Sequence, residues 1–291
     1  MSGLQVSPPH AAEEVKTALV TGGSAGIGLH TAVGLARAGM RVIVTGRDPR
    51  RTEAAQRFIT EQVQGAQVET ALADFASLAA VRGLAAEILR RHERLDVLVN
   101  NAGLISPRYT ESADGYELTI AVNHLAPFLL TNLLLDRLEA SAPARIITVA
   151  SAAHKGAKLN PATMIRPAHW TPLSAYGSSK LANILFTRAL ARRLDSAIAT
   201  AACLHPGVIA TAIGNRAGIL AGLGWRLAKP FLAGADKGAE TSIFLATTPN
   251  SAPLHGAYLT EKRIGKTDPL AGDDALGEAL WEESARLVGL G

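Results

Sequence analysis

Short runs of apolar and β-branched residues alternate with longer amphipathic segments along this chain from Thr17 onward. Such alternation is typical of repeated β-α units around a parallel sheet. Several of the short runs lack a polar residue at every second position, as expected for strands that helices cover on both faces. The predicted strands span residues 17–21, 41–45, 67–72, 97–100, 145–149, 200–204 and 257–259.

The amphipathic segments between these runs predict helices, which span residues 26–38, 78–92, 116–138, 175–194 and 238–246. No linker rich in proline or serine and no run of charges divides the series. We therefore predict an α/β fold with a single doubly wound Rossmann-type domain over residues 16–291, whose central parallel sheet is flanked by helices. Residues 1–15 are expected to form a disordered leader.

Two segments do not fit the β-α repeat. Residues 152–174 and 213–235 are long, contain glycine and proline, and follow predicted strands. Because the carboxyl ends of parallel strands gather the functional loops, we expect substrate contacts in both segments. The second segment also has apolar residues at amphipathic helical spacing, which favours a lid over an apolar pocket. A plain packing helix and a membrane-surface contact are the alternatives.

Composition and charge exclude several classes of function. The chain is 48% hydrophobic and 19% charged, and its net charge of +4 comes from scattered basic residues, so nucleic-acid binding is not expected. The single cysteine, Cys203, excludes an intrachain disulfide, and the histidines lack the spacing of metal ligands, so we predict no metal site. Neither a signal-peptide core nor an apolar run of ~20 residues is found, which predicts a cytoplasmic protein without a membrane span.

A glycine-rich loop follows the first predicted strand, with the sequence Thr21-Gly22-Gly23-Ser24-Ala25-Gly26-Ile27-Gly28, and leads into a predicted helix. Glycines let the backbone approach a pyrophosphate, and the helix N-terminus offers it free N–H groups. The spacing T-G-x-x-x-G-x-G differs from the G-x-G-x-x-G of the general dinucleotide fingerprint. Alone, such a loop is also the pattern of an ordinary tight turn before a helix.

Further motifs follow in order along the chain: Asn100-Asn101-Ala102-Gly103, Asn123, Ser151, Tyr176-x-x-x-Lys180 and Pro206-Gly207. Together with the loop, they resemble the short-chain dehydrogenase/reductase family over nearly the whole chain. Residues 122–131, 179–186 and 204–208 resemble its retinol dehydrogenase-like branch, which is also similar to the protochlorophyllide reductases. The resemblance implies an oxidoreductase that interconverts a carbonyl group, in an aldehyde or ketone, and an alcohol.

The end of the second strand bears on the choice of cofactor. Where relatives that use NAD carry an acidic residue for the ribose 2′-hydroxyl, this chain has Gly46, and Arg47 follows. A guanidinium pairs well with the 2′-phosphate of NADP, so we predict NADP(H) as the preferred cofactor and keep NAD(H) as the alternative. Arg47 as a solvated turn residue beside Asp48 is the other interpretation. The resemblance implies cofactor contacts at Thr21, Gly22, Ser24, Ala25, Gly26, Ile27, Gly28, Arg47, Asp74, Phe75, Asn101, Ala102, Gly103, Tyr176, Lys180, Pro206, Gly207, Val208 and Thr211.

Tyr176 and Lys180 are candidate catalytic residues, because four positions along a helix bring their side chains to one face. A tyrosine has an ordinary pKa of ~10, so its phenolate needs a cationic neighbour at neutral pH. A charge ~4 Å away at an effective dielectric of ~20 contributes at most roughly 4 kcal/mol, or about three pK units. The resemblance implies that Tyr176 transfers the proton and that Ser151 holds the substrate oxygen. It also implies that Lys180 binds the nicotinamide ribose and that Asn123 anchors a water of a proton relay.

The partner of this site is expected to be a small carbonyl or alcohol, and the apolar residues of 213–235 favour a lipophilic one. A catalytically silent NADP(H)-sensing regulatory protein of the same fold is the alternative, although retention of the catalytic residues argues against it. We also predict a homo-oligomer, because helices 116–138 and 175–194 resemble those that pair across subunits in many family members. The opposing interpretation is that the apolar residues of these two helices all belong to the core.

Overall fold

The computed structural model describes residues 14–207 and 234–290. Within them the strands form one sheet in the order β3-β2-β1-β4-β5-β6-β7-β8, and every neighbouring pair is parallel except β7 and β8. The strands are β1 (Thr17–Val20), β2 (Arg41–Gly46), β3 (Val68–Leu72), β4 (Val97–Asn100), β5 (Ala144–Val149), β6 (Ala199–His205), β7 (Tyr258–Thr260) and β8 (Arg263–Ile264). Each predicted strand is confirmed to within a residue at either end. The leader at 1–15 lies almost wholly outside the described residues and stays a prediction.

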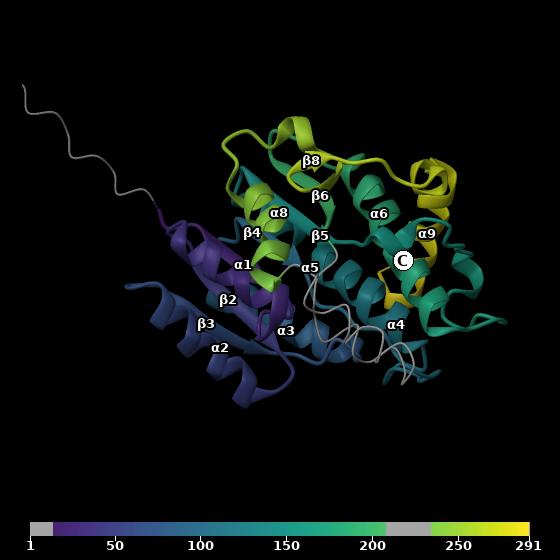
Figure 1. Cartoon of the computed structure of the whole chain (residues 1–291), viewed down its shortest axis with the longest axis horizontal. Helices are drawn as coiled ribbons and strands as arrows, with labels where there is room; N and C mark the ends of the chain where they lie inside the picture. Colours follow the sequence, from purple (N-terminus) through teal and green to yellow (C-terminus); the bar gives the residue numbers. More distant parts are fainter. Residues whose placement is uncertain (1–13, 208–233, 291) are drawn as a thin grey trace, which may run out of the picture.

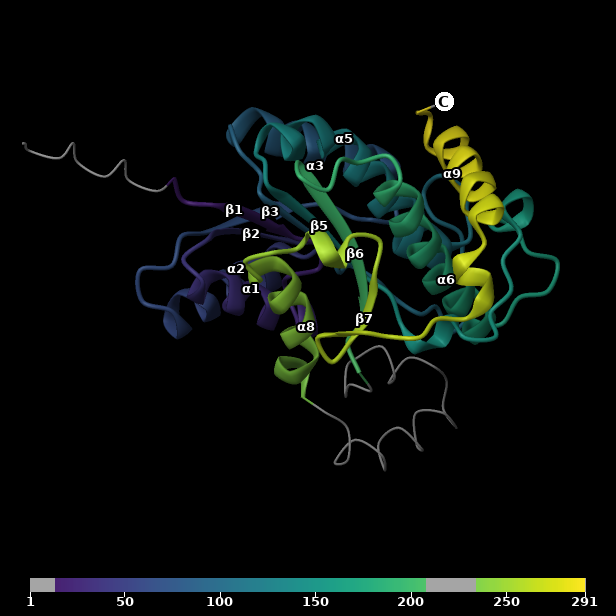
Figure 2. The same cartoon turned by 90° about the horizontal axis from the view of Figure 1, so that it is seen from above.

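Helices cover both faces of this sheet, as Figures 1 and 2 show. One face carries α1 (Gly26–Arg37), α2 (Pro49–Gln62) and α8 (Ala235–Thr247). The opposite face carries α3 (Leu78–Arg91), α5 (Ala126–Ala140) and α6 (Pro172–Ala191). The predicted doubly wound α/β architecture is therefore confirmed.

Successive residues of the central strands serve two different cores. Leu19 and Leu98 are fully buried in the core under α3, α5 and α6, whereas Ala18 and Val99 are buried in the core under α1 and α8. Because alternate side chains point to opposite faces of a strand, burial of both faces requires apolar residues at consecutive positions. This explains the continuous apolar runs in the sequence.

Of the strands and longer α-helices in the described residues, β8, α2 and α9 (Asp274–Val288) were not predicted. Helix α2 buries only Thr52, Ala55 and Ile59, so its apolar stripe is too sparse to stand out as a period. Helix α9 has clearer signals, since the Asp273 side chain accepts from the Leu276 N–H at its start and Gly289 follows its end with φ of 67°. Aspartate at the N-cap and glycine just after the C-terminus are the ordinary boundary signals of a helix.

The predicted helix 116–138 consists of three consecutive pieces. Helix α4 (Leu118–Ile120) leads into a π-helical turn, η1 (Ala121–Leu125), and then into α5. The turn contains Asn123, and such π turns occur frequently at functional sites. Leu118–Ala140 is long and apolar enough to cross a membrane by length and composition, but 78% of its most apolar window is buried inside the protein. Its apolar composition is accounted for by that burial.

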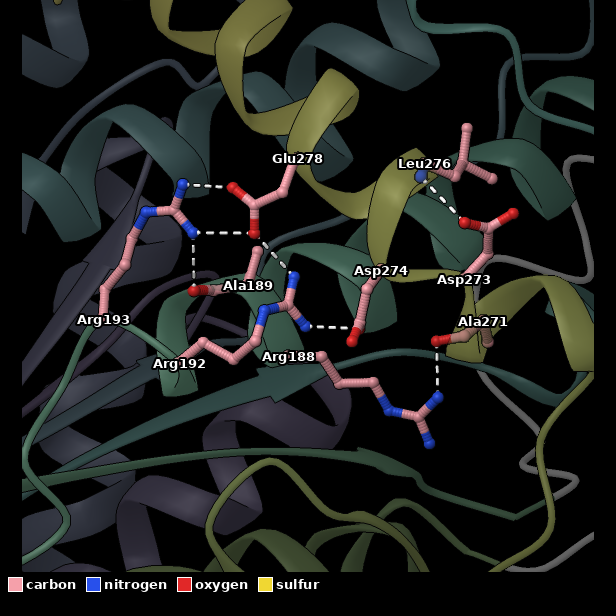
Figure 3. A network of polar contacts seen from close by, with 9 residues as sticks. All are labelled: Arg188, Ala189, Arg192, Arg193, Ala271, Asp273, Asp274, Leu276 and Glu278. Carbon is pink, nitrogen blue, oxygen red and sulfur yellow. Dashed lines mark hydrogen bonds and ion pairs between the residues drawn. The ribbon is translucent and has the colours of Figure 1, made fainter.

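Helix α9 lies against α5 and α6 on the outer side of that layer (Figure 2). The Trp281 ring centre is 5.0 Å from that of Phe128 and 5.9 Å from that of Phe186. Figure 3 shows the ion pairs around Glu278, which binds Arg192 at 2.7 Å and also binds Arg193. The helices for which subunit pairing was predicted are thus in contact with α9 of the same chain. Oligomerisation through these helices stays a prediction.

We expect apolar contacts, rather than the ion pairs, to hold α9 in place. Leu280 is fully buried, so Leu280→Ala should lower the free energy of unfolding by about 2–5 kcal/mol. Glu278→Gln should lower it by less than about 1 kcal/mol, because the ion pairs of Glu278 are partly solvated. Urea unfolding at neutral pH measures both changes. A larger loss of unfolding free energy in Glu278→Gln than in Leu280→Ala would mean that the ion pairs, and not the apolar contacts, hold α9 in place.

The ion pairs of Glu278 also predict a dependence on pH. Arg193 and Arg192 lower the pKa of Glu278 from 4.5 to about 2. A carboxyl whose pKa falls on folding stabilises the folded state above its ordinary pKa, and this contribution is lost as the pH falls toward 2. The difference in unfolding free energy between the wild type and Glu278→Gln should therefore shrink as the pH falls from 4.5 to about 2.

Candidate active site

The candidate residues gather at the carboxyl edge of the sheet. Thr21 follows β1, Asn101 follows β4, Ser151 follows β5 and Pro206 follows β6. Because these strands are parallel, their carboxyl ends lie at the same edge. Helix α6 adds Tyr176 and Lys180, and η1 adds Asn123. The Nζ atom of Lys180 would lie 3.7 Å from a Cβ on Gly103, in the loop after β4.

The glycine-rich loop has a shape that suits an anion. Gly22 and Gly26 have φ values of 63° and 56°, a region that residues with a Cβ rarely adopt. A Cβ on Gly28 would lie 2.5 Å from the carbonyl oxygen of Gly22, so glycine allows α1 to pack directly on the loop. Ala25 precedes α1 without a side-chain cap among the described residues, which leaves the first N–H groups available. These features fit the pyrophosphate of a dinucleotide.

Thr21 and Asn101 join the loop to the end of β4. The Thr21 hydroxyl oxygen accepts hydrogen bonds from the N–H groups of Asn101, at 2.9 Å, and Ala102, at 3.0 Å. The side-chain amide of Asn101 donates to the carbonyl of Thr21 at 2.8 Å. In this structure the two side chains therefore position the loop, a role that the motif alone did not indicate.

At the end of β2, Gly46 is buried and leaves no space for a side chain. A Cβ there would lie 2.4 Å from the Thr52 hydroxyl oxygen and 3.0 Å from that of Ser24. Arg47 is exposed, and the described part of the chain offers it no ion pair. Asp48 is engaged elsewhere, because it caps α2 by accepting from the Arg51 N–H at 3.2 Å. The sequence analysis did not identify Thr52, because its role comes from packing against Gly46 and not from a motif.

The other predicted cofactor contacts are only partly described. Asp74 is exposed, with one carboxylate oxygen accepting from the Ala76 N–H at 3.0 Å, and Phe75 is buried. Pro206 and Gly207 end the first described range. Val208, Thr211 and positions 213–233 of the predicted lid lie outside the described residues.

Helix α6 brings Tyr176 and Lys180 together. Its first turn is held by a capping box at Thr171, and Pro172 occupies the first helical position. The Lys180 Nζ atom lies 5.6 Å from the Tyr176 ring centre and donates a hydrogen bond of 2.8 Å to the carbonyl of Val149. Ser151 caps the short helix η2 (Ala152–His154), which follows β5, since its hydroxyl oxygen accepts from the Ala153 N–H at 3.2 Å. That geometry leaves the Ser151 O–H available as a donor.

Burial controls the protonation of this pair. It raises the pKa of Tyr176, and the nearby Ser151 hydroxyl opposes that rise. Burial also lowers the pKa of Lys180 from 10.5 to about 8. Burial is the larger of the two influences on Tyr176, and the lowering of its pKa by Lys180 stays a prediction. Tyr176 therefore keeps its proton at neutral pH.

Asn123 links the loop after β4 to α6. Its side-chain oxygen accepts from the Leu104 N–H at 2.8 Å, and its amide donates to the Leu104 carbonyl at 2.9 Å and to the Ser179 hydroxyl at 3.0 Å. Ser179 in turn donates to the carbonyl of Tyr176 at 2.7 Å. The sequence analysis assigned no role to Ser179. The available signal was its position directly before Lys180.

A cavity of about 600 Å³ lies between the 152–174 segment and the first turns of α6. Its wall includes Ile120, Leu159, Met164 and Leu173, but not Ser151, Tyr176 or Lys180. The first predicted substrate segment therefore lines a cavity together with the first turns of α6. Over the two described ranges, no group of three or more acidic, histidine or cysteine side chains is arranged to hold a metal ion.

Comparison with known proteins adds relatives to this geometry. The family model of short chain dehydrogenase matches residues 16–218. Retinol dehydrogenase 13 of Homo sapiens is 40% identical over 286 residues, which cover 94% of this chain and 85% of that protein.

Solved structures agree with this family. An uncharacterized protein from Mycobacterium paratuberculosis has a TM-score of 0.76 and 33% identity, over 94% of this chain and 93% of its own. A protein from Beutenbergia cavernae, described as an NAD(P)-dependent gluconate 5-dehydrogenase with bound NADP, has a TM-score of 0.67 and 29% identity, over 84% of this chain and 94% of its own. The chain therefore belongs to the short-chain dehydrogenase family and is similar to its retinol dehydrogenases.

Proposed function

We propose that this protein is an NADP(H)-dependent oxidoreductase that interconverts an aldehyde or ketone and an alcohol on a lipophilic small molecule. Family membership establishes the coarser statement, an oxidoreductase of alcohol or carbonyl groups. The observation that carries the finer proposal is the arrangement of Tyr176, Lys180 and Ser151 beside a glycine-rich loop that suits an anion.

Bound NADP(H) supplies or accepts the hydride in this chemistry. Ser151 donates its free O–H to the substrate oxygen and holds it beside Tyr176, since its own oxygen already accepts from Ala153. Tyr176 gives its proton to that oxygen during reduction and removes it during oxidation. The raised pKa of Tyr176 keeps the phenol protonated, which is the form that donates during carbonyl reduction.

Lys180 has two proposed tasks, which are to hold the nicotinamide ribose and to supply positive charge near Tyr176. Its pKa of about 8 means that the amine changes charge within the range in which such enzymes work. We expect anionic groups of a bound cofactor to favour the ammonium form, which in turn favours proton release by Tyr176. Asn123 would anchor the relay water through the remaining lone pair of its side-chain oxygen or through its carbonyl.

The preference for NADP(H) over NAD(H) is supported by the packing at Gly46. A carboxylate for the ribose hydroxyls has no space there, because a Cβ would already lie 2.4 Å from the Thr52 oxygen. The adjacent Arg47 is exposed and can turn to a 2′-phosphate. An aspartate in place of Gly46 would disturb the packing of β2 on α2 as well as change the charge. The cofactor preference is therefore better tested by removing the charge of Arg47.

We further propose a cytoplasmic protein that has no membrane span, binds no nucleic acid and holds no metal. Burial of Leu118–Ala140 inside the protein and the small net charge support this proposal. A lipophilic substrate is supported by the apolar residues around the cavity beside α6. The deciding experiment is a screen of aldehydes, ketones and alcohols of rising chain length with both cofactors, followed by nicotinamide absorbance. Binding of NADPH without turnover of any substrate would favour the sensing protein instead.

Tyr176→Phe should leave the dissociation constant of NADPH within about twofold of the wild type but lower kcat about 10²–10⁴-fold, because it removes the proton donor alone. Cofactor fluorescence titration and steady-state kinetics measure the two quantities. Tyr116→Phe is the matched control, since that hydroxyl donates to the Leu287 carbonyl on α9. Wild-type turnover in Tyr176→Phe would contradict the mechanism.

Lys180→Met should weaken NADPH binding and lower kcat, each by about tenfold to a hundredfold, because charge-assisted hydrogen bonds contribute ~1.5–3 kcal/mol. Methionine retains most of the buried volume. Lys237→Met changes an exposed lysine on α8 and is the control. If neither quantity changes in Lys180→Met, the lysine lies outside the functional site.

Arg47→Ala should raise the dissociation constant of NADPH about tenfold to a hundredfold and leave that of NADH within about twofold, because NADH has no 2′-phosphate. The penalty should shrink at high salt, since Arg47 is exposed. Arg57→Ala, which removes an exposed charge from α2, controls for the change in net charge. Equal losses for both cofactors would mean that the arginine serves structure, and the NADP assignment would be withdrawn.

A further inference from the structure

His154 is a fully buried histidine three residues after Ser151, at the end of the short helix η2 (Ala152–His154). Its Nδ1 atom lies 2.6 Å from the carbonyl oxygen of Ser151. Its Nε2 atom lies 3.2 Å from the backbone nitrogen of Asp268, which is 114 positions further along the chain. One ring thus joins the catalytic turn to a distant segment.

The two partners determine the tautomer of His154. A carbonyl oxygen can only accept, so Nδ1 must carry the hydrogen that is donated to Ser151. A backbone N–H can only donate, so Nε2 must present its lone pair to Asp268. Both ring nitrogens are therefore satisfied only in the neutral form with hydrogen on Nδ1.

The distant segment is itself well anchored. The Asp268 side chain accepts from the Gly156 N–H at 2.9 Å and from the Leu270 N–H at 3.0 Å. The Tyr258 ring of β7 packs edge-on against His154, with ring centres 5.1 Å apart. Arg188 of α6 also donates to the Ala271 carbonyl at 2.5 Å and to the Thr267 hydroxyl at 3.4 Å, so His154 connects the Ser151 carbonyl to a segment that is bonded to α6.

Ser151 needs such support because its own contacts are few. Its hydroxyl oxygen accepts one hydrogen bond of 3.2 Å, and its side chain is partly exposed. A short hydrogen bond to its carbonyl limits rotation of the peptide that follows its Cα atom. The orientation of the hydroxyl toward Tyr176 depends on that backbone.

We propose that His154 is a positioning residue, which holds the Ser151 backbone against the Asp268 segment and thereby aims the Ser151 hydroxyl at the substrate oxygen. The proposal rests on the proposed role of Ser151 in carbonyl chemistry. His154 touches neither substrate nor cofactor in this scheme and acts through Ser151 alone.

The same geometry predicts a dependence on acid. Burial lowers the pKa of His154, the bond to Ser151 opposes this, and Lys155, Asp268 and Arg188 add smaller contributions of both signs. Among the described residues, His205 and Tyr258 are the other titratable groups nearby: burial chiefly lowers the pKa of His205 and raises that of Tyr258 to about 12. Protonation of His154 would set an Nε2–H against the Asp268 N–H, so the bridge is present above the ordinary histidine pKa and is lost as the pH falls through the lowered one.

The test compares His154 with a second histidine of the same kind. His255 also joins two backbone groups, since its Nε2 lies 2.7 Å from the Ala191 carbonyl and its Nδ1 accepts from the Ala201 N–H at 3.3 Å. It lies near the start of β6, whereas the catalytic residues follow the ends of the strands. Phenylalanine in either position retains a ring and removes both hydrogen bonds.

His154→Phe should lower kcat about tenfold to a hundredfold and leave the dissociation constant of NADPH within about twofold, because displacement of a catalytic group by ~1 Å can cost ~10²-fold. Both variants should lower the melting temperature by similar amounts, but His255→Phe should leave kcat within about twofold of the wild type. His154→Asn restores a donor near the Nδ1 position and should recover part of the lost kcat. It should also remove the acidic limb that His154 gives to the kcat–pH profile.

Equal kcat losses in His154→Phe and His255→Phe, or no recovery in His154→Asn, would overturn the proposal. If His154→Phe does not fold, His154→Asn and its pH profile decide the question. Ser151→Ala separates this inference from the proposed function. Wild-type kcat in Ser151→Ala would refute the role of the serine itself, whereas an inactive Ser151→Ala beside a fully active His154→Phe would refute the positioning role alone.

Discussion

The buried amine of Lys180 is the constraint on which the rest of the site depends. A nitrogen that is almost completely removed from water needs a hydrogen-bond partner, and the carbonyl of Val149, the last residue of β5, provides one at 2.8 Å. That bond sets the register of α6 against the end of β5. Ser151 follows Val149 by two residues and Tyr176 precedes Lys180 by one helical turn, so this contact brings the two hydroxyl groups together.

Other buried polar groups complete the geometry that Lys180 begins. Asn123 and Ser179 tie the loop after β4 to the backbone of Tyr176, and His154 ties Ser151 to the C-terminal part of the chain. Hydrogen bonds weaken steeply with angle and distance, whereas apolar contacts tolerate small shifts. The two apolar cores therefore establish the sheet and its helices, while these polar contacts determine where the reacting groups point.

The sequence predicted the sheet well, because burial on both faces produces apolar runs such as that of β1, and it predicted which motif residues would meet at one edge. It failed for α2, whose buried stripe is sparse, and for properties that depend on a partner far away in the chain. The tautomer of His154 depends on Asp268, and the pKa of Tyr176 depends on burial and on the Ser151 hydroxyl. No local pattern carries such information.

The apolar segment Leu118–Ala140 illustrates how one sequence property has three structural interpretations: a membrane span, a subunit interface and a core helix. Burial inside the protein favours the third, and α9 adds to it through the contact of Trp281 with Phe128. Trp281 packs on the aromatic residues of α5 and α6 while its own ring is covered by the guanidinium of Arg193, 4.1 Å from its centre. Because α9 brings both the apolar contact and the charged cover, exposing this surface to a bilayer or to a second subunit would first require the loss of α9 packing.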